Sequence, residues 1–140
     1  MGLKIVAING SPHTTGNVAS ALSFIKKGIE NKNGTLVQFD LSKLNIKNCM
    51  GCRKCIENGG NCILSDDMKP IFEEIKTADV LIIASPIYIC QVNGFTKTFL
   101  DRLYPFTDEK HKPRFGTRRL YMLYTYGAPI PLVFSKYIRY

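Results

Sequence analysis

The chain has 140 residues, of which 45% are hydrophobic, and a formal net charge of +8, which suits a single folded domain. No apolar run reaches the roughly 18 residues of a membrane-spanning helix, and the chain begins on a strand pattern without a signal-peptide cleavage site, so we expect a cytoplasmic protein without membrane contact. The positive residues are spread over the chain, with one dense basic stretch at residues 111–119, and this distribution does not favour a nucleic-acid-binding protein.

The first half of the chain predicts a strand, a turn-rich loop, a helix and a second strand. Residues 3–8 are nearly all apolar, as in a strand that is covered on both faces. Residues 9–17 are rich in turn formers and small side chains. From Val18 to Ile29 the apolar residues recur at helical spacing. Residues 35–39 are the second strand candidate.

The second half continues the alternation of helices and strands. In order it predicts a helix opened by residues 66 and 67, a strand at 79–84, a loop at 85–93, a helix capped by Asn93, and a strand at 120–126. Such alternation implies an α/β fold with a doubly wound parallel sheet. Only residues 127–140 follow the fourth strand, so we expect a fifth strand to be short, missing or supplied by a partner.

Ligands of doubly wound sheets bind beyond the carboxyl ends of the strands. This rule brings three predicted loops together, at residues 10–17, 85–93 and 125–128. The first precedes a helix, and backbone N–H groups at a helix N-terminus attract a phosphate. Ser11, Thr15 and Asn17 add side-chain donors, and His13 could add another. A plain surface turn is the alternative for this loop taken alone.

Two familiar phosphate loops are excluded by what the segment lacks. No Gly-Lys-Ser/Thr opens the helix, which argues against a nucleoside triphosphatase. The spacing from Gly10 to Gly16 does not match the dinucleotide fingerprint.

Three ordered motifs resemble the flavodoxin-like NAD(P)H-dependent FMN reductase family over roughly residues 3–127. The motifs are Gly10-Ser11-Pro12-x3-Gly16-Asn17; Asp66-Asp67-Met68; and Ser85-Pro86-Ile87-Tyr88 followed by Asn93-Gly94, Lys97 and Leu100-Asp101-Arg102. The resemblance implies a flavodoxin-like sheet of order 2-1-3-4 and FMN as cofactor. Lys97 and Asp101 are spaced four residues apart on a helix, so we expect an intrahelical or subunit-contact ion pair rather than catalytic groups.

The resemblance assigns cofactor-binding residues in two of the loops. The FMN phosphate would be held by Ser11, His13, Gly16, Asn17 and Val18, with Thr15 as a further donor. The family often has a hydroxyl residue where this chain has Val18. The isoalloxazine ring would be lined by Ser85, Pro86, Ile87, Tyr88, Asn93 and Gly94. Because the flavin itself carries the chemistry, we assign no catalytic residue.

Four of the five cysteines fall in one short segment, as Cys49-x2-Cys52-x2-Cys55-x6-Cys62. In a reducing compartment such clustering indicates metal or redox chemistry. Runs of Cys-x2-Cys-x2-Cys are typical of 4Fe–4S clusters, whereas zinc sites more often use two separated pairs. A 4Fe–4S cluster is the favoured interpretation, with zinc and metal-free thiols as alternatives. Cys90 lies apart and is expected to be a packed side chain.

The cysteine motif resembles that of iron–sulfur flavoproteins, a branch of the same family. The resemblance implies one FMN-binding domain at residues 1–140 with a cysteine-rich insertion at 47–65, passing electrons between the cluster and FMN. NAD(P)H or a protein donor such as ferredoxin would supply electrons to a small-molecule acceptor, in a homo-oligomer. The alternatives are a cluster-free NAD(P)H-dependent FMN or quinone reductase, and a zinc-stabilised binding module with a basic surface.

Overall fold

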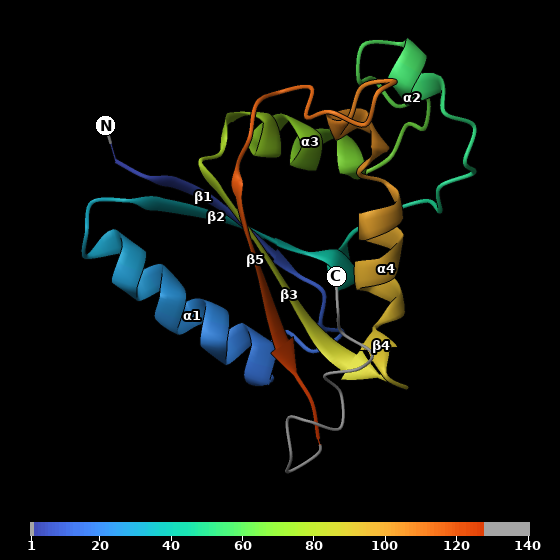
Figure 1. Cartoon of the computed structure of the whole chain (residues 1–140). Helices are drawn as coiled ribbons and strands as arrows, with labels where there is room; N and C mark the ends of the chain where they lie inside the picture. Colours follow the sequence, from blue (N-terminus) through green and yellow to red (C-terminus); the bar gives the residue numbers. More distant parts are fainter. Residues whose placement is uncertain (1, 128–140) are drawn as a thin grey trace.

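The structure, a computed structural model, describes residues 2–127 as alternating strands and helices around one sheet (Figure 1). The elements are β1 (Lys4–Asn9), α1 (Asn17–Glu30), β2 (Thr35–Asp40), the 3-10 turn η1 (Leu41–Lys43), α2 (Lys54–Glu57), α3 (Met68–Thr77), β3 (Val80–Tyr88), β4 (Gln91–Val92), α4 (Gly94–Asp101), the 3-10 turn η2 (Tyr104–Phe106) and β5 (Arg119–Thr125).

The long strands form a parallel sheet in the order β2-β1-β3-β5. This is the predicted order 2-1-3-4, because β5 is the strand expected at 120–126. The sheet lies between two layers of helices, with α1 on one face and α3 and α4 on the other (Figure 1). The flavodoxin-like α/β prediction is therefore confirmed.

Successive apolar side chains of β1 pack against different helices, because they point to opposite faces of the sheet. Val6 and Ile8 pack in the cluster that contains α3 and Phe99 of α4. Ile5 and Ala7 pack in the cluster that contains Val18 and Leu22 of α1. Both faces are buried, which explains why the strand reads as a continuous apolar run.

The segment predicted as a loop at 85–93 is mostly a hairpin instead. Strand β3 continues to Tyr88, and β4 pairs with it antiparallel, matching Ile87 with Val92. The continuation of the strand was not predicted, because a proline such as Pro86 within an apolar run argues against a central strand. Pro86 is tolerated here near the carboxyl end of β3, where it pairs in register with Thr125 of β5.

Strand β5 is less covered than β1 or β3. None of its residues is fully buried, and Leu120 and Tyr121 are 57% and 55% exposed. The expectation of a short, missing or partner-supplied fifth strand falls on residues 127–140, which apart from Gly127 lie outside the described residues, as does the end of the third predicted loop. Between residues 2 and 127, no helix combines the length and apolar character needed to cross a membrane.

Candidate functional site

The predicted phosphate loop begins where β1 ends, beside the carboxyl end of β3. The N–H of Gly10 continues the strand pairing by donating to the carbonyl of Ala84 at 2.8 Å. The Nδ2 of Asn93 donates to the carbonyl of Gly10 at 2.6 Å. A side chain at position 10 would collide with Thr96. The first two predicted loops therefore touch, as their positions in the sequence implied.

Asn9, the last residue of β1, fixes the start of this loop. Its Oδ1 accepts from the N–H of Ser11 at 3.0 Å, and its Nδ2 donates to Asp40 of β2 at 3.0 Å. Burial alone would raise the pKa of Asp40, but hydrogen bonds with Gln38 and Asn9 and the charge of Lys43 hold it below its ordinary value. Asn9 was not predicted as a site residue; a buried polar residue at the end of an apolar strand is the signal that could have found it.

The amino end of α1 is free to meet an anion. Gly16 is the cap residue, no side chain of the described residues caps the helix, and its first turn carries no acidic residue. His13, Thr15 and Asn17 are exposed around this end, whereas Ser11 is buried and its Oγ accepts from the N–H of His13 at 3.1 Å. The side chain of Val18 is 2% exposed in the core, so Val18 can offer an anion only its backbone N–H.

Three buried side chains stabilise the second loop. The hydroxyl of Thr96 lies 2.9 Å from Ser85 Oγ and 2.8 Å from Asn93 Oδ1. Asn93 is the cap of α4, as predicted, and accepts from the N–H of Thr96 at 3.1 Å. The predicted flavin residues Ser85 and Asn93 thus use their side chains inside the protein. They shape the loop and leave its backbone and Tyr88, 47% exposed, as its outward-facing groups.

The tip of the β3–β4 hairpin has an unusual backbone. Ile89 and Cys90 both have positive φ, at 46° and 64°. Two left-handed residues define the tight turn that suits a hairpin, but glycine and asparagine are the usual residues there. A β-branched residue such as Ile89 is strained in this conformation. Cys90 is partly buried, in agreement with its predicted packing role.

An apolar pocket of about 460 Å³ lies beside both loops. Pro12 comes from the first loop, and Tyr88 and Phe95 come from the second loop and α4. Leu41, Leu44 and Ile46 close the pocket from the segment that follows β2. Its volume is within the range of small-molecule sites, and its lining suits a flat, largely apolar ring.

The four clustered cysteines come together around one small cavity. Cys49, Cys52, Cys55 and Cys62 all line it, together with Arg102 and other residues. The cysteines are free thiols, and they range from exposed Cys52 to buried Cys55. The cavity itself is about 20 Å³, room for little more than a water molecule. Within residues 2–127, no three or more His, Cys, Asp or Glu side chains converge closely enough to hold a metal ion.

Three glycines allow the backbone of the cysteine segment to turn sharply. Gly51, Gly59 and Gly60 all have positive φ. The N–H of Gly51 donates to Cys49 Sγ at 3.4 Å. Burial raises the pKa of the Cys55 thiol, and the neighbouring sulfurs of Cys62 and Cys52 raise it further. Several thiolates side by side would repel one another, so this arrangement favours either protonated thiols or a cationic centre among them.

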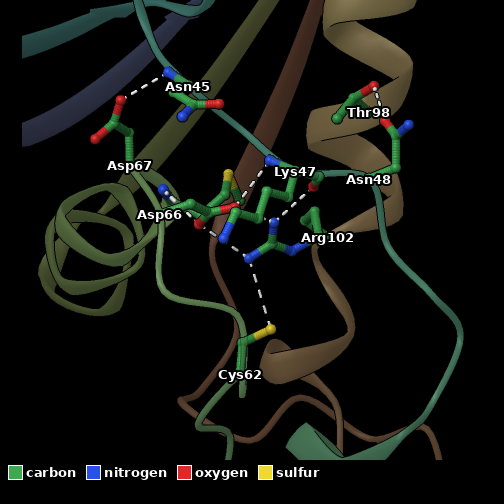
Figure 2. A network of polar contacts seen from close by, with 9 residues as sticks. Asn45, Lys47, Asn48, Cys62, Asp66, Asp67, Thr98 and Arg102 are labelled. Carbon is green, nitrogen blue, oxygen red and sulfur yellow. Dashed lines mark hydrogen bonds and ion pairs between the residues drawn. The ribbon is translucent and has the colours of Figure 1, made fainter.

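Arg102 joins the cysteine segment to α4 through a network shown in Figure 2. Its buried guanidinium forms a bidentate pair with Asp66, at 2.5 and 3.1 Å, and donates to the carbonyl of Lys47 at 2.7 Å. Its Nη2 lies 3.6 Å from Cys62 Sγ. Burial alone would raise the pKa of Asp66, but its hydrogen bonds with Arg102, Lys47 and Met68 hold it below its ordinary value. Sequence reasoning missed this pairing and assigned Asp66 to the amino end of α3.

The basic stretch at 111–119 is partly structural. Arg114 donates to the carbonyls of Ile56 and Thr107, and Arg118 donates to those of Phe115, Gly116 and Lys76. His111 is exposed. The predicted ion pair between Lys97 and Asp101 is present on the surface of α4.

Several curated proteins similar to this chain are named iron–sulfur flavoproteins. An iron–sulfur flavoprotein of Archaeoglobus fulgidus is 34% identical over 111 residues, covering 79% of this chain and 49% of that protein. One from Methanocaldococcus jannaschii is 35% identical over 103 residues, covering 71% and 50%. One from Clostridioides difficile is 35% identical over 100 residues, covering 70% and 44%. The chain thus spans about half the length of the curated relatives it matches.

Solved structures agree on the fold. An apo NADH:FMN oxidoreductase superposes with a TM-score of 0.65 at 22% identity, covering 97% of this chain and 65% of that one. An NAD(P)H:quinone oxidoreductase from Methanothermobacter marburgensis superposes at 0.71 with 17% identity, covering 91% and 68%. The family model for NADPH-dependent FMN reductases matches residues 3–128. By this match and by its iron–sulfur flavoprotein relatives, the chain belongs to the NADPH-dependent FMN reductase family.

Proposed function

We propose that this chain is an FMN-dependent oxidoreductase that passes electrons between FMN and a 4Fe–4S cluster. The observation that carries the proposal is the placement of the two sites on one helix. Asn93, the cap of α4, holds the flavin-type loop, and Arg102, just past its end, holds the cysteine segment. Helix α4 is eight residues long, about 12 Å, a short span between two redox sites.

The residues of the two loops would bind and orient FMN. The N–H groups at the amino end of α1 and the donors of Ser11, His13, Thr15, Gly16 and Asn17 would meet the phosphate. The backbone of Pro86, Ile87, Tyr88 and Gly94 would meet the polar edge of the ring, with Ser85 and Asn93 fixing that backbone from inside. The apolar pocket would exclude water beside the ring. FMN, when bound, supplies exchange of one or two electrons.

The donor set of the cysteine cavity fits an iron–sulfur cluster better than a single ion. Four thiols line one cavity, as cluster ligation requires. Within residues 2–127 no set of side chains converges on a metal centre of any kind, so the preference for a cluster over zinc rests on the Cys-x2-Cys-x2-Cys spacing. Nη2 of Arg102, 3.6 Å from Cys62 Sγ, adds a positive donor beside the thiols. Because the cavity is small, the exposed arm around Cys52 would move outward to admit a cluster.

The small cavity also favours the second candidate, a cluster-free NAD(P)H-dependent FMN or quinone reductase. The two candidates share the flavin site and differ only in the role of the cysteines. In either case we place the protein in the cytoplasm, where its thiols stay reduced. We further propose one domain with its cysteine segment inserted between β2 and α3, a nicotinamide or ferredoxin-like donor, and a homo-oligomer.

Anaerobic purification followed by a visible spectrum and iron, sulfide and flavin assays tests the proposal. We expect one FMN and about four iron and four sulfide per chain. Cys55→Ser should lose iron and sulfide but keep FMN, because Cys55 lies in the cysteine cavity. Cys90→Ser is the matched control and should keep both, because Cys90 lies outside that cavity.

The outcomes separate the candidates. A yellow protein without iron would leave the cluster-free reductase. A protein that binds neither flavin nor iron under these conditions would reject both candidates. Retention of iron by Cys55→Ser would overturn the assignment of this cysteine as a ligand.

A further inference from the structure

Arg102 is the most completely buried charge in the described part of the chain. Its side chain and that of Asp66 are each 1% exposed. A buried ion pair contributes little net stability, because the desolvation of both ions offsets much of their attraction. The arrangement of its contacts points to positioning instead.

The Arg102–Asp66 pair closes the base of the cysteine segment. Asp66 accepts from the N–H of Lys47 at 2.9 Å, and Arg102 donates to the carbonyl of the same residue at 2.7 Å. Asp66 also accepts from the N–H of Met68 at 3.1 Å. Lys47 and Asp66 lie on either side of the four cysteines, so both ends of the segment are fixed to the end of α4 (Figure 2).

The same guanidinium reaches one of the sulfurs. Nη2 of Arg102 lies 3.6 Å from Cys62 Sγ, a charged donor on a candidate ligand. The other partly buried arginines, Arg114 and Arg118, donate to main-chain carbonyls. This contact links Cys62, which is partly buried, to the end of α4, whereas Cys52 is exposed.

We propose that Arg102 is a positioning residue for the cysteine site: with Asp66 it closes the base of the segment, and it holds Cys62 by donating to its sulfur. The part that concerns a cluster rests on the proposed function. Hydrogen bonds to ligand sulfurs help to set cluster potentials, and a positive donor favours the more reduced, more negative state. With a cluster bound, Arg102 would raise its midpoint potential as well as place the ligand.

Hydrogen exchange on the whole 140-residue chain without metal tests the positioning directly. In Arg102→Gln we expect the amides of Lys47 and Met68 to exchange about tenfold faster or more, since bonds to charged groups contribute at least that factor. The amides of β1 and β3 should keep their protection. Arg118→Gln, which removes an arginine bound only to carbonyls, is the matched control and should leave Lys47 and Met68 unchanged.

The loaded protein supplies the second readout. After anaerobic reconstitution with iron and sulfide, Arg102→Gln should bind less iron per chain and show a lower midpoint potential than wild type. Arg102→Lys keeps the charge without the bidentate geometry and should give intermediate values. Arg118→Gln should match wild type in both measurements.

Each outcome decides the inference. Wild-type exchange at Lys47 and Met68 in Arg102→Gln overturns the positioning role, and an unchanged potential with full iron loading overturns the donation to Cys62. If Arg102→Gln loses protection throughout β1 and β3, the variant is destabilised as a whole, and Arg102→Lys is measured in its place. Faster exchange of Arg102→Lys confined to the cysteine segment supports the proposal. Wild-type exchange of Arg102→Lys in that segment overturns it. If wild type takes up no iron while Arg102→Gln exchanges faster locally, the cluster function fails and the positioning of the segment stands.

Discussion

Gly10 lies where two strands and α4 meet, with no room for a side chain. A Cβ there would sit 1.9 Å from Thr96 Oγ1 and 3.1 Å from the carbonyl of Ala84. Thr96 is fully buried and bonded to Ser85 and Asn93, so it cannot move aside without breaking that network. We expect Gly10→Ala to lower the free energy of unfolding by about 1–3 kcal/mol and to weaken FMN binding.

Urea unfolding and flavin titration measure both effects of Gly10→Ala. The control is Gly28→Ala on the exposed side of α1, where a Cβ meets nothing within 4 Å. That change should raise stability by about 0.5–1 kcal/mol, because alanine favours the helix. Equal stabilities of the two variants would contradict the close approach at Gly10.

The depressed pKa of Asp66 predicts an acid-dependent loss of stability. The unfolded carboxyl ionises near pH 4, and the folded one below that because Arg102 and two N–H groups stabilise its charge against burial. A depressed folded pKa contributes stability that is present above the unfolded pKa and is lost as pH falls through the folded one. Urea midpoints between pH 7 and 2 should fall for wild type below about pH 4.

The Asp66→Asn variant isolates this contribution. It should be less stable than wild type at pH 7, because it leaves Arg102 buried without a counter-charge, and its stability should depend less on pH in the acid range. Asp101→Asn removes an exposed carboxylate from α4 and should have little effect at pH 7. An acid dependence of Asp66→Asn as steep as that of wild type would reject the assignment.

At the scale of elements, the β3–β4 hairpin has a strained backbone at Ile89, whose side chain is almost fully exposed. Ile89 is 95% exposed and has φ of 46°, and Cys90 follows with φ of 64°. Replacing the pair by Asn-Gly, as Ile89→Asn with Cys90→Gly, should raise the free energy of unfolding by about 1–3 kcal/mol. Thermal and urea unfolding measure the gain, and Ile63→Asn, an exposed change outside the hairpin, should give none. A lower stability of the double variant would show that the turn is not strained.

Elements with a strong local pattern could be predicted from the sequence. The apolar run of β1 and the spacing of Val18 and Leu22 in α1 determined their type, because each buries a continuous face. The cap at Asn93 could also be predicted, because a helix cap depends on residues that are close in the sequence. The continuation of β3 through Pro86 was missed, because a local rule against proline was overridden by pairing with β5.

The site was predictable in its loops and not in its long-range contacts. Turn chemistry and helix starts located the segments around Ser11 and Asn93. The pairing of Asp66 with Arg102 joins residues 36 apart and has no local signature. The acidic pair before α3 offered a local explanation for Asp66, a favourable helix dipole, which hid the tertiary one.

At the scale of the whole molecule, β5 exposes apolar side chains within the described residues 2–127. Leu120 and Tyr121 are more than half exposed on this strand. We expect more than one copy per particle in solution. The double change Leu120→Lys with Tyr121→Lys should shift the protein to monomer, because adjacent side chains of a strand point to opposite faces and the change places charge on both faces of β5. Size exclusion with light scattering measures the mass. Phe24→Lys, at an exposed aromatic of α1, is the control, and a double variant that keeps the wild-type mass would place the contact elsewhere.

Helix α4 imposes a constraint on length rather than on composition. Asn93 and Arg102 are nine positions apart, which is two and a half turns of about 3.6 residues, so they lie on opposite sides of the helix axis. Asn93 bonds to Gly10 of the first loop, and Arg102 bonds to Lys47 of the cysteine segment. Each inserted or deleted residue would rotate one end against the other by about 100° and part the flavin loop from the cysteine segment. The exposed positions between them that lie outside the apolar pocket, Lys97 and Asp101, are free to vary in kind. Across related genomes, this stretch should tolerate many substitutions and almost no change in residue count.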